Sequence, residues 1–522
     1  MKRFYLIFIS LAAIMSVGMD ILNLNLQAQV SYKVPYFEDG LRHEKIKMTF
    51  SMVDSTYRDV ALKNNYPGLA YGIVVDGRLV HTGNFGYTDV TNKIPVTSSS
   101  MFRIASMSKS VTAMAILHLR DQGKLNLDDS VEKYVPEMKN QNNLTNDAPL
   151  VTIRHCMTHN AGFPEDNPWG DRQLQDSDDD LSDLLKSKVA FSNVPDVAYE
   201  YSNLGFALLG RIITKVSGVQ YQQFIKENIL KPLNMPKTDW EYDKIKKDEL
   251  ALGYRWLDGK HQEEALLHDN PNGSWGAMGA MISSVEEFAG YMSFHISAWP
   301  PKSDVELGPI KRNSVREMHK PWNFSEFNPN QRYPDGRYCA TASAYGYGIR
   351  WAKNCEDKIY TGHSGGLPGF GSNWLIMPEY GIGVVSFANR TYAGTSSVNM
   401  QVIDAIVKNA GLKPRVIPAS DILIKRKDEL MALLPDWKNG EQSGIFAENF
   451  FPDFILSKLR EQSQSLFQKA GRIVKVHEIV PENQLRGTFL IEGVNATLKV
   501  YFTLSPENPP LIQDFSINEN HK

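Results

Sequence analysis

The sequence is poor in cysteine, which limits what can hold its fold together. Three cysteines occur among 522 residues, namely Cys156, Cys339 and Cys355. An odd and small number excludes a fold built on a disulfide framework. Cys339 and Cys355 could pair, a question that the sequence leaves open, whereas Cys156 lies among apolar residues and is expected to be a small core residue.

The sequence also lacks an excess of charge of one sign and, beyond its N-terminus, long hydrophobic runs. It has 56 Lys and Arg against 59 Asp and Glu, a formal net charge of -3. This near balance gives no support for nucleic acid or an anionic surface as partner. No later stretch approaches the roughly 18 unbroken apolar residues of a membrane span. We therefore expect neither nucleic-acid binding nor a membrane span after removal of the N-terminal segment.

The first 28 residues have the layout of a signal peptide. Met1-Lys2-Arg3 is basic, residues 4–17 are apolar, and a polar stretch leads to Ala28. This order predicts export with cleavage after Ala28, and the alternative is an uncleaved anchor. Because no cysteine lies near the site, a lipid-modified N-terminus is not expected. The predicted location is periplasmic or secreted.

Residues 102–117, with the sequence FRIASMSKSVTAMAIL, are the most informative stretch of the chain. The part after Ser106 is rich in Ala and Met, lacks Gly and Pro until Gly123, and is apolar on nearly every face. This composition predicts a buried helix of roughly four turns with Gly123 as its C-terminal cap. Ser106 is expected at the N-cap or in the first turn, with Lys109 on the same face.

This pairing is chemically sufficient for a nucleophile and its base. A serine hydroxyl needs a base, and a lysine can act as one only when it is neutral. The lysine pKa of roughly 10.4 falls in an apolar setting, and a helix N-terminus favours negative charge on the serine oxygen. A second Ser-x-x-Lys, Ser130 to Lys133, has no apolar helix behind it and is predicted to be a capped surface turn.

The remaining chain predicts a sheet built from both ends around a helical middle. Residues 70–75 and 78–83 flank Asp76-Gly77, a strong signal for a two-residue hairpin turn. Residues 151–233 have a helical pattern. Strands are expected over 347–351, 358–361, 371–376 and 383–388, followed by a helix over 395–409. The predicted fold is α/β, an antiparallel sheet flanked by helices with an inserted helical lobe.

A domain boundary is predicted around Gly411 to Pro414. It is followed by helical patterns over 421–434 and 451–469 and by strand patterns over 474–480, 487–491, 497–504 and 511–517. These patterns predict a small C-terminal α+β domain, whose role the sequence does not give. The chain is thus divided into a signal peptide (1–28), a main domain (29–412) and a C-terminal domain (413–522).

Two further segments carry side chains that could join the serine and lysine. Tyr201 and Asn203 are two apart in a polar loop, so in an extended segment they face the same way. A phenol can relay a proton, and an amide can hold a substrate carbonyl. The glycines of residues 362–366 allow a substrate backbone to approach a strand edge. The N–H of Gly366 could form an oxyanion hole with that of Ser106.

Taken in order, these motifs resemble a known family. Ser106-Met107-Ser108-Lys109, Tyr201-Ser202-Asn203 and His363-Ser364-Gly365 are similar to the three motifs of the serine β-lactamase and penicillin-binding-protein superfamily. The likeness is greatest to its class C-type branch, which includes esterases and D-amino-acid peptidases. It covers about residues 67–411 and implies a β-lactamase/transpeptidase-like fold.

The resemblance implies a role for each motif residue. Ser106 would form an acyl-enzyme, while Lys109 and Tyr201 share general-base and general-acid duty. Asn203 would orient the substrate amide, and the N–H groups of Ser106 and Gly366 would bind the oxyanion. The substrate would lie against His363, Ser364, Gly365 and Gly366. The family often has lysine where His363 stands; because histidine is only partly charged near neutral pH, recognition of a substrate carboxylate is less assured.

The sequence allows three other interpretations. Residues 362–366 match the G-x-S-x-G elbow of α/β-hydrolases, but the residues after them predict a strand where the elbow needs a helix. His155 and His159 have the spacing of zinc ligands without the glutamate of H-E-x-x-H, so structural histidines fit better. A non-catalytic cell-wall or peptide binder would be supported by loss of the nucleophile, base or tyrosine, and all three are present.

The sequence therefore predicts an exported serine hydrolase that needs no metal or cofactor. Its expected substrate is a D-amino-acid peptide or ester of the cell envelope, or a small acyl ester. A class C-like β-lactamase ranks behind these substrates, because nothing in the sequence identifies a dedicated site for a deacylating water. The oligomeric state is left open.

Overall fold

The computed structural model describes residues 32–520, so the predicted signal peptide and its cleavage site lie outside the described residues. Two compact units are present. One comprises residues 39–414, and the other comprises the described residues before 39 together with those from 415 onward. Among residues 32–520, no helix is both long and apolar enough to cross a membrane.

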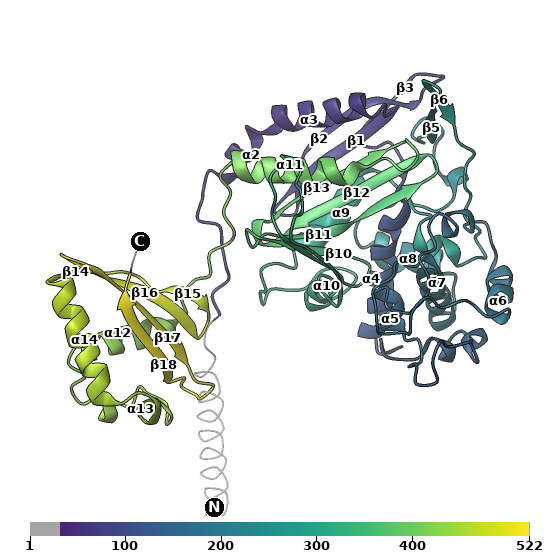
Figure 1. Cartoon of the computed structure of the whole chain (residues 1–522). Helices are drawn as coiled ribbons and strands as arrows, with labels where there is room; N and C mark the ends of the chain where they lie inside the picture. Colours follow the sequence, from purple (N-terminus) through teal and green to yellow (C-terminus); the bar gives the residue numbers. More distant parts are fainter. Residues whose placement is uncertain (1–31, 521–522) are drawn as a thin grey trace, which may run out of the picture. The chain divides into compact units, whose positions relative to one another are not determined.

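The main unit is built on a nine-stranded antiparallel sheet (Figure 1). Its spatial order is β3-β2-β1-β13-β12-β11-β10-β9-β8. The strands are β1 (Gly68–Val75), β2 (Arg78–Asp89), β3 (Ile94–Pro95), β8 (Asn323–Asn328), β9 (Thr341–Tyr345), β10 (Arg350–Asn354), β11 (Ile359–Leu367), β12 (Phe370–Met377) and β13 (Ile382–Ala388). Since β1 pairs with β13, the two ends of this unit close one sheet, which confirms the predicted architecture.

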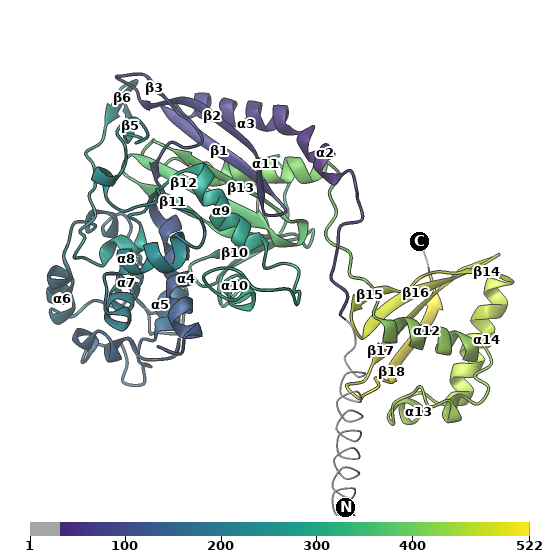
Figure 2. The same ribbon diagram turned by 180° about the vertical axis from the view of Figure 1, so that it is seen from behind.

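Both faces of this sheet are covered by helices, as Figures 1 and 2 show from opposite sides. On one face α3 (Phe50–Lys63) and α11 (Thr395–Asn409) pack in a core that includes Ile73 and Val75. On the other face α9 (Val285–Ile296) packs in the core that includes Val74. Successive side chains of a strand point to opposite faces, so a strand buried on both faces is apolar throughout, as β1 is.

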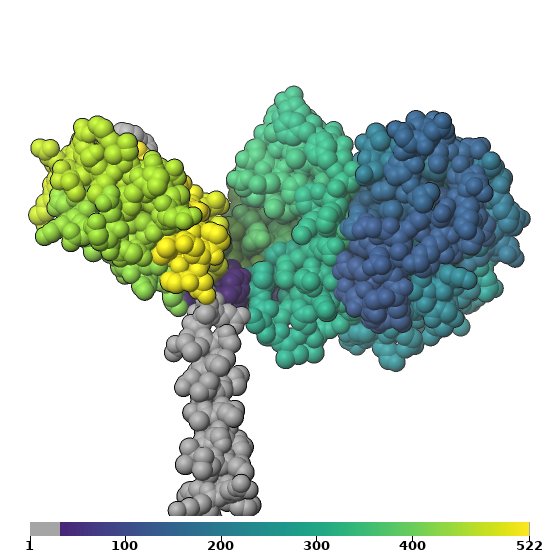
Figure 3. Space-filling model, turned by 90° about the horizontal axis from the view of Figure 1, so that it is seen from below, coloured from purple at the N-terminus to yellow at the C-terminus, as the bar shows by residue number. Residues whose placement is uncertain are grey.

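The helical lobe lies between the two halves of the sheet in sequence and forms a rounded body (Figure 3, blue). It contains α4 (Ser108–Asp121), α5 (Ile153–Met157), α6 (Asp178–Lys186), α7 (Asn203–Ser217) and α8 (Tyr221–Ile225). As predicted, α4 is almost wholly buried and ends before Gly123, whose φ is 72° and whose N–H bonds to Arg120. The α-helix begins at Ser108 rather than Ser106, which lies in a preceding 3-10 turn, Ala105–Met107.

Smaller elements complete this unit. They are the helices α2 (Arg42–Lys47) and α10 (Arg312–Met318) and the paired short strands β4 (Phe102–Arg103) with β7 (Ile282–Ser283) and β5 (Tyr254–Leu257) with β6 (Lys260–Glu263).

The predicted strand over 347–351 is wrong for residues 347–349, whereas residues 350 and 351 begin β10. The structure has a turn between β9 and β10 at that point, with Gly348 at φ 64° and the N–H of Gly346 bonded to Ile349. A glycine in the left-handed region ends a strand. The apolar residues around it have a strand-like sequence pattern, which led to the wrong prediction. The strand predicted over 358–361 in turn continues through residues 362–366 to Leu367, so the third motif lies within β11.

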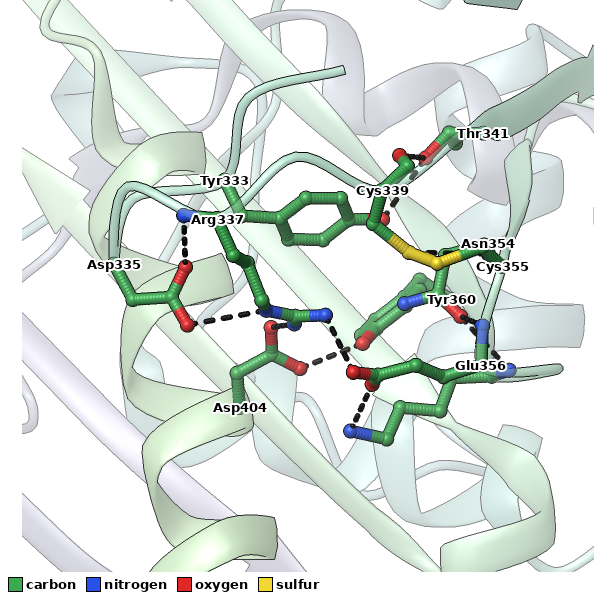
Figure 4. The surroundings of a disulfide bond; sticks show 11 residues. Tyr333, Asp335, Arg337, Cys339, Thr341, Asn354, Cys355, Glu356, Tyr360 and Asp404 are labelled. Carbon is green, nitrogen blue, oxygen red and sulfur yellow. Dashed lines mark hydrogen bonds and ion pairs between the residues drawn. A yellow bond between two sulfur atoms is a disulfide. The ribbon is translucent and has the colours of Figure 1, made fainter. Parts of the chain in front are cut away.

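Cys339 and Cys355 form a disulfide bond (Figure 4). The bond joins the segment before β9 to the turn between β10 and β11. Arg337 lies beside it and makes ion pairs with Glu356 and Asp404, at 2.9 and 2.6 Å. The ends of three neighbouring strands are therefore tied together covalently and by charge. Cys156 is a buried free thiol, as expected, and burial raises its pKa to about 12.

The C-terminal unit is the predicted α+β arrangement of helices and an antiparallel sheet. The strands are β14 (Ile473–Val476), β15 (Val480–Asn483), β16 (Arg486–Gly493), β17 (Thr497–Leu504) and β18 (Ile512–Glu519), and the helices are α12 (Asp421–Leu433), α13 (Phe450–Asp453) and α14 (Leu456–Ala470). Trp437, Phe489 and Phe502 lie in its separate core. The single helix predicted over 451–469 is two helices, α13 and α14.

Candidate active site

Ser106 is held on a tight turn against the middle of the sheet. The residue before it, Ala105, has φ 50°, a conformation that side chains rarely adopt. The carbonyl of Ile104 accepts a 2.6 Å hydrogen bond from Ser372 Oγ on β12. A Cβ on Gly365 of β11 would run into that carbonyl and into Ala105, so only glycine lets the strand lie this close. The turn and the third motif are therefore packed directly together.

Lys109 is completely buried and points its amine at Ser106. Lys109 Nζ lies 3.0 Å from Ser106 Oγ, 2.6 Å from Asn203 Oδ1 and 2.8 Å from the carbonyl oxygen of Met278. Within the described chain no carboxylate forms an ion pair with it. Burial lowers the pKa of Lys109 to about 7, although the more distant Asp166 and Asp171 oppose the change. A large fraction of this amine is thus neutral at neutral pH and able to accept the serine proton.

Tyr201 completes the contact with the nucleophile. Its side chain is buried, it hydrogen-bonds Ser106, and its ring centroid is 4.9 Å from Lys109 Nζ. Burial raises the pKa of Tyr201 well above its ordinary value, against the effects of Arg350 and of the Ser106 hydrogen bond. The phenol therefore keeps its proton near neutral pH. It can donate or relay a proton, but as a resting base it is far weaker than Lys109.

Asn203 is the first residue of α7 and connects Lys109 to a neighbouring loop. Its Nδ2 donates a 2.6 Å hydrogen bond to Asn167 Oδ1. The helix start is capped by Asp166, which accepts from the backbone N–H of Asn203 at 2.6 Å and of Leu204 at 2.9 Å. A carboxylate at a helix N-terminus is favourable, because it satisfies free N–H groups and the helix dipole. Asp166 lies 37 residues from Asn203 in the chain, so no local sequence pattern predicts this cap.

His363 does not supply a positive charge to the site. Its side chain is buried, with Nε2 2.7 Å from the Tyr345 hydroxyl and Nδ1 2.6 Å from the carbonyl oxygen of Ser364. Burial lowers the pKa of His363 well below its ordinary value, with further contributions from Arg350 and Lys109. The expectation of a partly charged histidine is therefore wrong, because the sequence could not show that the ring is enclosed.

The strand that carries His363, Ser364, Gly365 and Gly366 has a partly uncovered edge. β12 pairs with β11 over 361–367, whereas β10 pairs with it only over 359–362. Among the described residues, no strand therefore pairs with the edge of residues 363–367 that faces away from β12. Such an edge offers backbone donors and acceptors to an extended ligand.

Arg350 is a residue that the sequence did not single out. It lies at the start of β10, its guanidinium carbon is 5.4 Å from the Tyr201 ring centroid, and it hydrogen-bonds Tyr199. Together with His363 and Ser364 it lines a cavity of about 210 Å³. Within the described chain it has no carboxylate partner. The positive charge beside the third motif thus belongs to an arginine from the neighbouring strand.

The other candidate motifs of the sequence do not form the sites that their patterns suggested. Residues 131–133 form a short surface turn, in which Lys133 pairs with Asp129 at 2.9 Å. β11 runs through residues 362–366 into a hairpin with β12, so it is not a nucleophile elbow. His155 Nδ1 and His159 Nδ1 accept hydrogen bonds from two different backbone N–H groups, at 3.3 and 3.1 Å. These contacts give both rings a structural role.

Known proteins with a similar sequence carry the same domain. The Beta-lactamase family model matches residues 51–406. Protein flp of Staphylococcus aureus (strain COL) is 29% identical over 343 residues, which is 65% of this chain and 62% of flp. Beta-lactamase-like protein 2 of Dictyostelium discoideum is 30% identical over 265 residues, 49% of this chain and 47% of that protein. The match therefore spans less than two thirds of either relative.

Solved structures share the fold at lower sequence identity. An octameric penicillin-binding protein homologue from Pyrococcus abyssi has a TM-score of 0.57 and 21% identity, covering 90% of this chain and 99% of that one. A class C β-lactamase has a TM-score of 0.54 and 20% identity, covering 71% and 99%. Because the family model matches well over half of the chain, this protein belongs to the Beta-lactamase family, within the serine β-lactamase and penicillin-binding-protein superfamily that its motifs resemble.

Proposed function

We propose that this protein is an exported serine hydrolase that cleaves D-amino-acid peptides or esters through a Ser106 acyl-enzyme. The observation that carries the proposal is the 3.0 Å contact between Ser106 Oγ and the buried Lys109 amine, whose pKa is about 7. Members of this family are generally serine hydrolases, which agrees with a nucleophile and base in contact. The N-terminal segment supports export, as does the Cys339–Cys355 disulfide, because such bonds persist in oxidising compartments.

In acylation Lys109, Ser106 and Tyr201 act one after another. Neutral Lys109 takes the Ser106 hydroxyl proton while Oγ attacks the substrate carbonyl carbon. The developing oxyanion is bound by the N–H groups of Ser106 and Gly366. As the intermediate collapses, the bond to the leaving group breaks, and the proton passes from Lys109 through the Tyr201 hydroxyl to that group. Lys109 is neutral again, and the acyl group remains on Ser106.

This mechanism predicts the pH dependence of acylation. Because only neutral Lys109 acts as base, the acylation rate should rise with pH and level off above an apparent pKa of about 7. Tyr201 titrates far higher and should cause no fall in the same range. The burst of p-nitrophenol from p-nitrophenyl acetate, measured by stopped flow, gives this rate. A burst rate that falls as pH increases through neutrality would show that protonated Lys109 is required instead.

The preference for a free carboxylate is proposed to rest on Arg350. A peptide ending in a D-amino acid carries a carboxylate on its leaving side, and Arg350 has no acidic partner among residues 32–520. Replacing Arg350 with glutamine should lower kcat/KM for a D-Ala-D-Ala-terminated peptide by roughly 10–100-fold, the value of a charged hydrogen bond. For the same peptide with a C-terminal amide, kcat/KM should fall much less.

A matched control is available on the same strand. Lys353 is exposed at the other end of β10 and pairs with Asp357 on the surface. Lys353→Gln should leave both peptides unaffected. If Arg350→Gln lowered kcat/KM equally for the acid and the amide, the arginine would support the structure of the site but would not recognise a substrate carboxylate.

One experiment separates the candidate activities. The purified protein is incubated in parallel with a fluorophosphonate, a penicillin and p-nitrophenyl acetate, and any adduct is located by mass spectrometry. Turnover of the ester with a Ser106 adduct supports the proposal, whereas rapid turnover of penicillin would favour a β-lactamase. Absence of every adduct would indicate a non-catalytic binder.

A further inference from the structure

Asp171 is a buried carboxyl group that the acylation steps leave unused. It lies in the short turn Gly170–Arg172 and is 2% exposed. Its Oδ2 accepts a 3.0 Å hydrogen bond from the Tyr392 hydroxyl. No lysine, arginine or histidine of the described chain forms an ion pair with it. A buried carboxyl without a cationic partner is costly, so its position calls for an explanation.

Asp171 lies between two groups that reach the reacting atoms. On one side Gly170 packs against Asn203, since a Cβ on this glycine would be 2.8 Å from Asn203 Nδ2. Asn203 in turn holds the Lys109 amine. On the other side the ring of Tyr392 packs on Gly366, where an added Cβ would be 3.0 Å from Tyr392 Cδ1.

Tyr392 is fixed to the end of the β11–β12 hairpin. Its backbone N–H bonds to the carbonyl oxygens of Leu367 and Phe370, at 3.2 and 3.1 Å. Its backbone is therefore held beside Gly366, and the hydrogen bond from its hydroxyl to Asp171 holds the ring. An acyl group on Ser106, with its carbonyl oxygen at the N–H groups of Ser106 and Gly366, would occupy the space between the Lys109–Asn203 pair and Tyr392.

We propose that Asp171 is the general base that activates water to hydrolyse the Ser106 acyl-enzyme. The proposal rests on the proposed function and extends it to the second half of the reaction. The water oxygen bonds to the acyl carbon while one water proton moves to the Asp171 carboxylate. The proton then passes from Asp171 to the neutral Lys109 amine, and as the bond from that carbon to Ser106 Oγ breaks, the Lys109 ammonium gives it to Oγ. Asp171 is ionised and Lys109 neutral again, so both groups end as they began.

The charge state of Asp171 suits this role. Burial raises its pKa to about 6; Tyr392, Lys109 and Arg172 oppose the change, and Asp166 adds to it. A base works best when its pKa is near the working pH. Above an apparent value of about 6 the carboxylate is ionised, so hydrolysis of the acyl-enzyme should accelerate as pH increases through that range. Asp166 is no rival, because both of its oxygens already accept from backbone N–H groups.

The test is the variant Asp171→Asn, which keeps the shape and an acceptor for Tyr392. With p-nitrophenyl acetate, the burst rate should stay within about threefold of the wild type, while the steady-state rate falls by roughly 10²–10⁴-fold, the usual value of a positioned base. Mass spectrometry of the quenched reaction should then find most of the protein acetylated on Ser106. Hydroxylamine, a stronger nucleophile than water, should release much of that acetyl group.

Tyr392→Phe distinguishes a base from a merely structural carboxyl. It removes the hydrogen bond that lowers the Asp171 pKa, so the pH midpoint of deacylation should move upward while the maximal rate changes little. If Asp171 only positions Tyr392, Tyr392→Phe should instead lower the maximal deacylation rate while Asp171→Asn, which keeps the acceptor, should not, and that result would overturn the proposal. Unchanged deacylation in Asp171→Asn would overturn it as well. Absence of both turnover and a Ser106 adduct in the wild type is a different result, because it refutes the proposed hydrolase function itself.

Discussion

Replacing Ser106 with alanine is expected to abolish turnover, with a loss of roughly 10⁴–10⁶-fold in kcat, the range seen when a serine hydrolase loses its nucleophile. The reason is that, within the described chain, Ser106 is the only serine or threonine whose hydroxyl hydrogen-bonds Lys109. The variant should fold normally, because Lys109 keeps its bonds to Asn203 and Met278. Ester hydrolysis and labelling by a fluorophosphonate measure the effect, and both should disappear together.

The chain contains its own control for this experiment. Ser130 occupies the same place in a second Ser-x-x-Lys sequence, but that sequence folds as a surface turn. Ser130→Ala should therefore retain wild-type turnover and wild-type labelling. If the two variants lost activity equally, or if the label stayed on the Ser106→Ala variant, the nucleophile would have been assigned to the wrong serine.

The contacts of the site that could be predicted from the sequence are those between residues that lie close together in the chain. Ser106 and Lys109 are three residues apart at the start of an apolar helix, so their contact follows from helical spacing. Tyr201 and Asn203 were linked to them through the resemblance of motifs in order. The structure adds one local detail that no pattern indicated, the left-handed conformation of Ala105 that places Ser106 in a 3-10 turn.

The residues of the site that the sequence did not reveal are positioned by the register of strand pairing and by the course of a loop. Arg350 falls within the strand predicted over 347–351, but the sequence pattern could not fix the direction of its side chain. Its position beside the third motif follows from the register of β10, in which it opposes Gly362. Asp166 and Asp171 lie in an irregular loop, and their neighbours come from α7 and from the turn after β13. Such contacts are set by tertiary packing, which no short sequence pattern records.

The burial of His363 and the position of Arg350 together determine where the positive charge of the site lies. A lysine in the third motif would carry its own charge to the substrate. Here the histidine ring is buried against Tyr345, and Arg350, in a different strand, carries the charge. Any preference for anionic substrates therefore depends on how β10 and β11 pair, and the disulfide that ties the ends of these strands helps to hold that pairing.

Lys109→Met should lower the acylation rate by roughly 10²–10⁴-fold, because the serine then has no base in contact. Lys133→Ala is the matched control and should be silent, since that lysine pairs with Asp129 on the surface. An unchanged acylation rate in Lys109→Met would remove lysine from the mechanism.

The same variant tests whether Lys109 is neutral in the folded protein. Burial lowers its pKa from 10.5 to about 7, so between these values the unfolded chain binds a proton that the folded protein does not. The free energy of unfolding must then rise with pH for the wild type relative to Lys109→Met across this interval. Urea unfolding of both proteins at several pH values measures the difference. A difference that does not change with pH would mean that the buried amine keeps its ordinary pKa and stays charged, and a charged lysine cannot be the base that activates Ser106.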